Sequence, residues 1–318
     1  MQAFLRLIRW PNLIIIPLVM AAIRFAVMEP MLHISGMSPV MPLREFWLMV
    51  LATMFLGSGG YIINDYFDRK IDLINKPGKV VVGQKMSRIG AITWHIIFNS
   101  LAVLIGLWLA WQVHLWWVAA VYAFVSGIFW FYSTTYKRMF LIGNIIVSLL
   151  TAMVPFQVLL FEYTYQANEG IMLFGEGPLQ QNLYIIALWV TAFSFFAFMT
   201  NLIREIVKDF EDIRGDMRYG RKSVPIVLGL KSTKWVVQVL TLATILAIIY
   251  VASRVVFDWF SWVYISTLII LPLLLHMYLL HFAHKKRQFH RISQLMKIVM
   301  FTGLLYALIV RYNVLQIV

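Results

Sequence analysis

The chain has 318 residues, of which 61% are hydrophobic and 13% are charged, and its formal net charge is +13. Its mean hydropathy of +0.80 is far above that of a soluble globular protein, so the composition indicates an integral membrane protein. The chain contains no cysteine, which excludes disulfide bonds, thiolate metal sites and a cysteine nucleophile.

Apolar runs of about 20 residues, the length that crosses a bilayer as a helix, recur nine times along the chain. They lie near residues 10–28, 46–63, 89–111, 115–134, 139–161, 182–201, 233–252, 260–281 and 296–315. The first run follows "MQAFLRLIRWPN" without a small-residue cleavage site, so we expect a retained span rather than a signal peptide. No polar linker divides the chain. We therefore expect one all-α integral membrane domain, residues 1–318, with nine transmembrane helices around a central cavity.

The basic residues alternate between the two ends of these spans. Of the 27 Lys and Arg residues, 23 lie in the N-terminal segment, in the 64–88, 204–234 and 285–297 loops and in the 137–138 turn. Because Lys and Arg concentrate on the cytoplasmic side of short loops, this distribution predicts a multi-pass protein of the plasma or inner membrane with a cytoplasmic N-terminus. It also explains the net charge without a nucleic-acid partner, although a basic soluble domain would suggest one.

The second span ends in an acidic segment, "NDYFDRKIDLINKP". Asn64, Asp68 and Asp72 recur at intervals of four residues, so on a helix they share one face. Asp65 lies about 100° away from Asn64 and points elsewhere or supports the others indirectly.

The sixth span is followed by a second acidic segment, "REIVKDFEDIRGDMRYGRKSVP". Its stripe consists of Glu205, Asp209, Asp212 and Asp216. Two such stripes facing one cavity would repel each other unless cations neutralise them, and oxygen ligands of this kind suit Mg²⁺. The alternative is that these are ordinary solvated residues beside the spans.

Cations follow both stripes: Lys76, Lys79 and Lys85 after the first, and Arg218, Arg221 and Lys222 after the second. A divalent cation held by carboxylates, with Lys and Arg around it, is a common way to bind a diphosphate. Each cation taken alone is equally explained as a marker of the cytoplasmic side.

These segments carry a family resemblance. "NDYFDRKID" resembles the N-x-x-x-D-x-x-x-D motif, and "DIRGD" the D-x-x-x-D motif, of the UbiA-type intramembrane prenyltransferases. The resemblance spans nearly the whole chain, with the motifs after the second and sixth spans. "RWPN" is similar to the family's R-P-x-N start, and "YSTTYKRMFLIGN" to its tyrosine–lysine segment. "INKPGKVVVGQKMS" departs from the family pattern, with Lys79 where arginine is common and Val80 where proline is.

The resemblance implies helical cap loops on the cytoplasmic side after helices 2 and 6, and Mg²⁺-dependent transfer of a polyprenyl group from its diphosphate. The donor would be a polyprenyl diphosphate, and the acceptor a lipid-soluble or membrane-interface molecule among the membrane lipids. The implied catalytic and metal-binding residues are Asn64, Asp68, Asp72, Asp212 and Asp216. The implied substrate-binding residues are Arg9, Asn12, Asp65, Lys79, Tyr132, Lys137, Asp209 and Lys222. Lys79, Lys137 and Lys222 are candidate donors to the leaving diphosphate, and Asp209 is either a base or a partner of Arg204 or Lys208.

The acceptor is less constrained than the reaction. Within the family, "REIVKDFEDIRGD" with "INDYFD" is most similar to the branch that adds a geranylgeranyl chain to geranylgeranylglyceryl phosphate in ether-lipid synthesis. An aromatic acceptor in quinone synthesis stays open, and so does a protein of another class, a transporter or a non-catalytic binder of prenyl diphosphates. The prenyl chain length and the oligomeric state cannot be predicted from these patterns.

Overall fold

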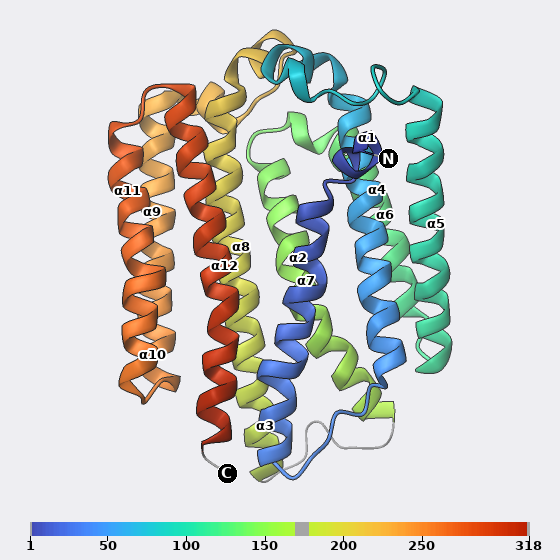
Figure 1. The fold of residues 1–318 in the computed structure, drawn as a ribbon, viewed down its shortest axis with the longest axis vertical. Helices are drawn as coiled ribbons and strands as arrows, with labels where there is room; N and C mark the ends of the chain where they lie inside the picture. Colours follow the sequence, from blue (N-terminus) through green and yellow to red (C-terminus); the bar gives the residue numbers. More distant parts are fainter. Residues whose placement is uncertain (1, 169–177, 317–318) are drawn as a thin grey trace.

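The computed structural model describes residues 2–168 and 178–316, apart from the side chains of Lys79 and of residues 178–182. These residues are almost entirely helical (Figure 1). The elements in chain order are α1 (Gln2–Leu7), α2 (Trp10–Ala21), η1 (Ala22–Met28), α3 (Glu29–Ile34), α4 (Leu43–Asn75), η2 (Pro77–Lys79), α5 (Arg88–Gln112), α6 (Trp117–Thr134), η3 (Tyr136–Arg138), α7 (Ile142–Asn168), α8 (Pro178–Arg218), α9 (Val224–Val255), α10 (Trp259–Tyr264), η4 (Ile265–Ile270), α11 (Leu271–Phe282) and α12 (Lys286–Leu315). Of the short elements, η1 and η4 are π-helical, and η2 and η3 are 3-10 turns.

Within the described residues, nine helices are long and apolar enough to cross a membrane. Their bounds are Trp10–Ile34, Leu43–Asn75, Arg88–Gln112, Trp117–Thr134, Ile142–Asn168, Leu183–Arg218, Val224–Val255, Trp259–Phe282 and Lys286–Leu315. The predicted all-α membrane fold is therefore confirmed. The second and sixth helices continue well past the predicted ends of the apolar runs at residues 63 and 201, and these extensions carry the acidic stripes.

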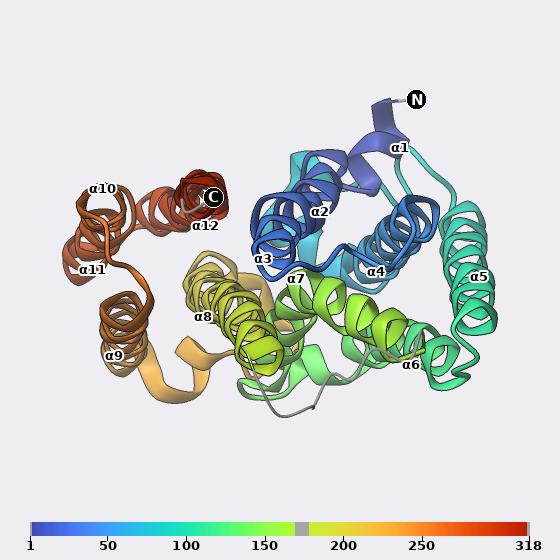
Figure 2. The ribbon, with the colours of Figure 1, turned by 90° about the horizontal axis from the view of Figure 1, so that it is seen from below.

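The helices form two packed groups that α8 joins. Viewed along the bundle, α2 to α7 lie on one side of α8, and α9 to α12 lie on the other (Figure 2). Each group has its own hydrophobic core, and Trp189 and Phe193 of α8 pack against both. Because α8 belongs to both groups, its inner face is placed where a central cavity can form.

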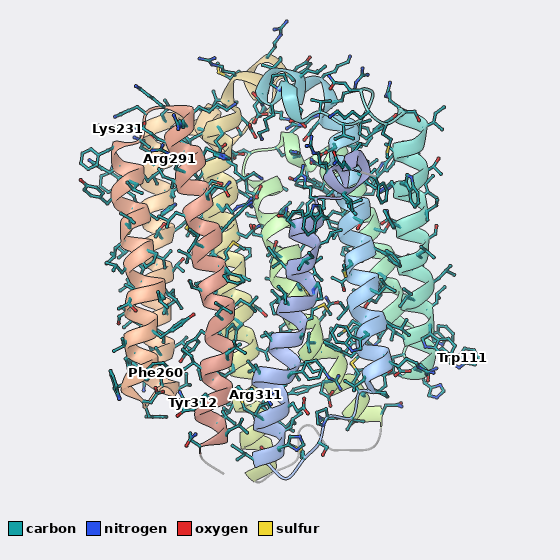
Figure 3. All side chains as sticks on the ribbon, in the orientation of Figure 1. Trp111, Lys231, Phe260, Arg291, Arg311 and Tyr312 are labelled. Atoms are coloured by element: carbon teal, nitrogen blue, oxygen red, sulfur yellow. The ribbon has the colours of Figure 1, made fainter. Side chains whose placement is uncertain are left out.

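We call the end of the bundle where α4 and α8 finish the motif end, and the opposite end the far end. Figure 3 places Lys231 and Arg291 at the motif end, and Trp111, Phe260, Arg311 and Tyr312 at the far end. These three aromatic side chains are exposed. Exposed aromatic side chains near the end of a helical bundle are typical of the interface between a bilayer and water.

The chain beyond the two acidic helices contains little separate helical structure. After α4 it forms the short turn η2 and an irregular segment, until the Ser87 hydroxyl accepts from the backbone N–H of Gly90 at 3.0 Å and starts α5. After α8, residues 219–223 lead into α9, which is interrupted at Gly229, where φ is 78°. The helical cap loops expected after these two helices are not confirmed. The acidic stripes lie instead on the last turns of α4 and α8 themselves.

The far end contains a buried ionic group, the far-end cluster of Arg24, Val40, Met41 and Glu162. The Glu162 carboxylate accepts from the backbone N–H groups of Val40 and Met41 at 2.6 and 3.3 Å. The Arg24 guanidinium donates to the carbonyl of Met41 at 2.5 Å and lies 3.9 Å from a Glu162 oxygen. These contacts attach the segment between α3 and α4 to the first and fifth spans.

Candidate active site

The two acidic helix ends are attached to each other by one asparagine. The Asn75 side chain, at the end of α4, donates to the backbone carbonyl of Asp212 at 3.0 Å and accepts from the backbone N–H of Gly215 at 2.9 Å. A Cβ at position 215 would lie 2.5 Å from the Asn75 amide nitrogen. The close approach of α4 and α8 therefore requires glycine at this position.

Asp68 is the centre of the charged cluster between these helices. It is 3% exposed, and its two carboxylate oxygens form ion pairs with Lys137 of η3 and with Arg221 in the α8–α9 connection. Lys137 also donates to the Asn64 side-chain oxygen at 2.6 Å. One carboxylate thus joins three separate elements of the chain.

Both cations of this cluster stay protonated at physiological pH. Burial disfavours the charged form of Lys137, but the adjacent Asp68 carboxylate outweighs burial and raises the pKa of Lys137 above its ordinary value. Burial also opposes the charge of Arg221, and here Asp68 and Asp216 together raise the pKa of the guanidinium. The cluster therefore presents two fixed positive charges.

The remaining motif carboxylates differ in how they are paired. Asp216 lies 3.5 Å from Arg221, and Asp212 pairs with Lys76 at 2.8 Å through one oxygen. The other Asp212 oxygen, Oδ1, is buried and has no hydrogen-bond partner. Among the described residues, the Asp72 side chain forms no hydrogen bond or ion pair, although it lines the same cavity. Asp72 and Asp212 therefore have carboxylate oxygens available to a ligand.

These oxygens fit a hard divalent cation, because Mg²⁺ prefers carboxylates, water and substrate phosphates. In the described part of the chain, no three His, Asp or Glu side chains are arranged to hold a metal ion by themselves. The donor set thus matches a cation that is held jointly by the protein and by the phosphate oxygens of a substrate.

A cavity of about 1050 Å³ extends from this cluster into the bundle. This is large for a small-molecule site, which usually measures about 300–1,000 Å³. At the motif end the cavity is lined by the ionic residues, and deeper in the bundle by apolar side chains from six spans, among them Ile16, Leu56, Phe129, Val154, Phe196 and Phe301. A ligand with a charged head and a long apolar tail matches this division.

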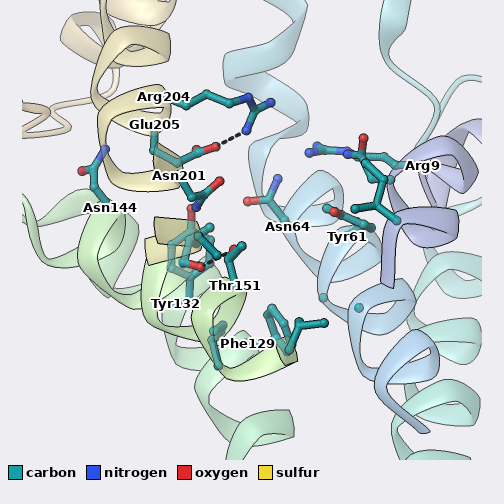
Figure 4. A pocket seen from close by; sticks show the side chains of 18 of the residues that line it. Arg9, Tyr61, Asn64, Phe129, Tyr132, Asn144, Thr151, Asn201, Arg204 and Glu205 are labelled. Atoms are coloured by element: carbon teal, nitrogen blue, oxygen red, sulfur yellow. Dashed lines mark hydrogen bonds and ion pairs between the residues drawn. The ribbon is translucent and has the colours of Figure 1, made fainter. Parts of the chain in front are cut away.

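Polar side chains from several helices lie where the two parts of the cavity meet. In Figure 4, Arg9, Tyr61 and Asn64 lie on one side of the pocket, and Asn144, Arg204 and Glu205 on the other. Glu205 pairs with Arg204 and Lys208, each at 2.8 Å. Asn144 donates to Asp209 at 3.1 Å. Asp209 therefore pairs with Asn144 rather than with Arg204 or Lys208, the partners considered from the sequence.

The N-terminal motif reaches the same pocket. The chain turns at Arg9, which has a φ of 51°, and α2 begins at the next residue. The Arg9 guanidinium then pairs with Asp65 at 2.7 Å and lies over the ring of Tyr61, with its central carbon 4.9 Å from the ring centroid. Asp65 therefore faces the N-terminal segment, as its angle from Asn64 predicts.

Most of the residues predicted from the sequence line this one cavity: Arg9, Asn12, Asn64, Asp65, Asp68, Asp72, Tyr132, Lys137, Asp209, Asp212 and Asp216. Lys222 is not brought there. It is exposed, and its backbone N–H donates to the carbonyl of Arg138 at 3.0 Å. The chain turns after α8 so that the neighbouring Arg221 points inward and Lys222 outward. The side chain of Lys79 lies outside the described residues.

Three further site residues received no individual role from the sequence pattern. Arg221 was one of the six cations noted after the two stripes, and Asn75 and Gly215 had no assigned role. The available signal was the glycine inside "DIRGD", because a glycine within an otherwise regular helix often marks a close approach of another backbone or side chain.

Comparisons with known proteins agree with this arrangement. The sequence model described as the UbiA prenyltransferase family matches residues 31–304. Digeranylgeranylglyceryl phosphate synthase from Thermococcus kodakarensis is 32% identical over 202 residues, 63% of each chain. The synthase of that name from Methanobrevibacter smithii is 34% identical over 184 residues, 58% of each chain. The matched regions thus span less than two thirds of these two relatives.

Two solved structures have the same fold. The structure of a digeranylgeranylglyceryl phosphate synthase aligns over 96% of this chain and 98% of its own, with 22% identity and a TM-score of 0.60. A UbiA homologue from Archaeoglobus fulgidus bound to GPP and Mg²⁺ aligns over 96% of this chain and 99% of its own, with 18% identity and a TM-score of 0.52.

Proposed function

Because this chain belongs to the UbiA prenyltransferase family, we propose that it transfers a geranylgeranyl group from geranylgeranyl diphosphate to geranylgeranylglyceryl phosphate in ether-lipid synthesis. One observation carries the proposal. The two acidic helix ends, with Lys137 and Arg221, line the motif end of a cavity whose deeper walls are apolar. A prenyl diphosphate has the same two parts, a charged head and an apolar chain.

The residues divide into those that hold a cation and those that hold the leaving group. Asn64, Asp68, Asp72, Asp212 and Asp216 would hold Mg²⁺. When bound, Mg²⁺ supplies positive charge that offsets the charge of the diphosphate. Lys137 and Arg221 donate hydrogen bonds to the diphosphate oxygens, and the Asp68 carboxylate positions both cations. A UbiA homologue from Archaeoglobus fulgidus was solved with GPP and Mg²⁺ bound, which supports a site that takes a prenyl diphosphate together with the metal ion.

The reaction breaks the allylic C–O bond, and the diphosphate leaves with the electron pair. The acceptor hydroxyl oxygen forms the new C–O bond and releases its proton. We assign this proton to Asp209, which lines the cavity one helical turn closer to the membrane centre than Asp212. We assign the ring of Tyr132, whose centroid lies 5.8 Å from the Lys137 ammonium, to stabilising the developing allylic cation.

The names of the relatives support the choice of acceptor. Two relatives that are 32% and 34% identical carry the name digeranylgeranylglyceryl phosphate synthase, which supports a prenylated glycerol phosphate over an aromatic acid. This acceptor is itself a membrane lipid with a charged head. A cavity that is ionic at one end and apolar along its length suits both substrates.

A transfer assay tests the proposal. The purified protein in nanodiscs is given Mg²⁺ and geranylgeranyl diphosphate with geranylgeranylglyceryl phosphate, 4-hydroxybenzoate or no acceptor, and released diphosphate and the prenylated product are measured. We expect product with the glycerol phosphate, lost with EDTA and in Asp72→Asn. Product with the aromatic acid alone would move the assignment to quinone synthesis. Donor binding without any product would indicate a non-catalytic binder.

We also propose that the motif end faces the cytoplasm, supported by the 23 of 27 cations in the loops expected on that side. The cysteine-free chain allows a direct test with single cysteines. In intact cells, a membrane-impermeant maleimide should label Tyr312→Cys but should label Lys222→Cys only after permeabilisation. The reverse pattern would contradict the proposed orientation.

A further inference from the structure

The first three turns of α12 carry a polar face that the proposed donor site does not explain. We define the α12 stripe as Lys286, Arg287, His290, Gln294 and Lys297. His290, Gln294 and Lys297 line the main cavity, whereas Lys286, Arg287 and His290 line a second pocket of about 380 Å³. Lys76 and Glu211 line both pockets as well, so the second pocket is a side chamber of the cavity at the motif end.

The charge of this side chamber is positive. Lys286 donates to the backbone carbonyl of Asn75 at 2.8 Å, which holds its ammonium beside the end of α4. Neither Lys286 nor Arg287 forms an ion pair with any described residue. Glu211, the one carboxylate in the lining of the chamber, lies 2.9 Å from His290. Two permanent cations are therefore available to an anion.

The character of α12 changes along the cavity. Below the stripe, its cavity-lining residues are Met300, Phe301 and Leu304, all apolar. From Lys286 to Lys297 the helix rises about 16 Å, and the apolar residues continue from there into the bundle. Along α12, the lining residues thus change from the cations Lys286 and Arg287, through His290, Gln294 and Lys297, to the apolar Met300, Phe301 and Leu304.

We propose that the α12 stripe binds the phosphate headgroup of the acceptor lipid, while Met300, Phe301 and Leu304 contact its prenyl tail. A phosphate monoester carries close to two negative charges and accepts paired hydrogen bonds from arginine and single ones from lysine. This inference rests on the proposed function and deepens it, because it assigns the choice of a phosphorylated acceptor to α12 and leaves diphosphate binding to α4, α8, Lys137 and Arg221.

The test compares two acceptors that differ only in the phosphate, geranylgeranylglyceryl phosphate and geranylgeranylglycerol, in nanodiscs of phosphatidylcholine. In the double variant Lys286→Gln/Arg287→Gln we expect the KM for the phosphorylated acceptor to rise roughly tenfold or more. The KM for the unphosphorylated acceptor and the KM for the donor should stay within about twofold. Arg291→Gln is the matched control, because Arg291 lies on the same helix and is exposed like Lys286 and Arg287, but lines neither pocket.

Anionic lipid is a second source of the same phosphate chemistry. The assay is therefore repeated in nanodiscs that contain phosphatidylglycerol. If the stripe binds bulk lipid headgroups instead of the acceptor, the variant will change the response to phosphatidylglycerol equally with both acceptors, and the proposal is overturned. An unchanged KM for the phosphorylated acceptor overturns it as well.

Direct binding separates failure of this inference from failure of the proposed function. Calorimetry with geranylgeranylglyceryl phosphate needs no turnover. Tight binding to the wild type that is weakened in the double variant supports the stripe even if no product forms. Equal binding by both proteins rejects the stripe while leaving prenyl transfer intact.

Discussion

In the described residues, a buried ionic cluster lies at each end of the bundle, and the two clusters differ in what surrounds them. At the motif end, Asp68, Lys137 and Arg221 line a cavity, and each comes from a different element. At the far end, Arg24 and Glu162 line no described pocket and are 6% and 2% exposed. The far-end charges bind backbone groups of the segment between α3 and α4 instead.

The difference teaches how charge is used inside an apolar protein. Ionic groups are costly in the bilayer unless they are paired or face a water-filled cavity. At the motif end the paired charges face a cavity, where a charged ligand can contact them. At the far end the paired charges form hydrogen bonds with the backbone of the segment between α3 and α4. We therefore expect substitutions at the motif end to change catalysis, and substitutions at the far end to change stability.

The largest expected effect is that of Asp68→Asn. Transfer should fall by about 100- to 1,000-fold, because Lys137 and Arg221 lose the carboxylate that positions them against the leaving group. Some stability should be lost as well, because the same buried carboxylate joins three elements of the chain, so transfer is compared per folded molecule. Product formation and unfolding are measured on the same nanodisc sample. A variant that unfolds early but keeps its turnover per folded molecule would show that Asp68 is a structural residue.

The far-end counterpart is Glu162→Gln. Loss of this charge leaves the Arg24 guanidinium without its carboxylate, so the free energy of unfolding should fall by about 3 kcal/mol. Turnover per folded molecule should stay within twofold. Glu29→Gln is the comparison variant, because the pair of Glu29 with His33 at 3.7 Å is partly exposed and should contribute about 1 kcal/mol or less. If Glu162→Gln kept its stability but lost turnover, the far-end cluster would serve catalysis as the motif-end cluster does.

Two adjacent cations sharpen the comparison within the motif end. Arg221→Gln should lower transfer roughly 30-fold, because its guanidinium pairs with Asp68 and Asp216 in the cavity. Lys222→Gln should stay within twofold of the wild type, because that side chain is exposed. Steady-state kinetics of both variants check the assignment. Equal losses would mean that position 222 reaches the substrate, as the sequence pattern predicted.

A smaller effect is expected where the two acidic helices touch. Gly215→Ala places a methyl group against the Asn75 side chain and should separate the stripes slightly, with roughly a tenfold loss of transfer. Asn75→Ala removes the obstructing amide, so the double variant should lose less than the sum of the two single losses. The two losses are compared as free energies in a double-mutant cycle. Simple additivity would show that the methyl group acts elsewhere.

The sequence predicted the spans and the acidic stripes because both depend on local periodicity. Nine apolar runs have the length of a bilayer crossing, and carboxylates spaced by three or four residues share a helical face wherever the helix continues. The convergence of the two stripes was also predictable, since both follow spans that end on the same side of the membrane.

The remaining features depend on distant contacts that spacing does not reveal. Arg24 and Glu162 are far apart in the chain, and the charge count could only place Arg24 away from the basic loops. Whether Arg221 or Lys222 points inward depends on how the chain turns after Arg218, where no helical periodicity applies. The close approach at Gly215 likewise depends on the side chain of Asn75 in another helix.

The placement of all motif carboxylates at one end of the cavity has a consequence for the membrane as a whole. Under the proposed function, donor and acceptor both enter with their phosphates at the motif end, and the product keeps its phosphate there. Every new lipid is then delivered to the same leaflet. Synthesis by this protein alone would enlarge one leaflet and not the other, so balanced membrane growth requires a separate activity that moves the finished lipid across the bilayer.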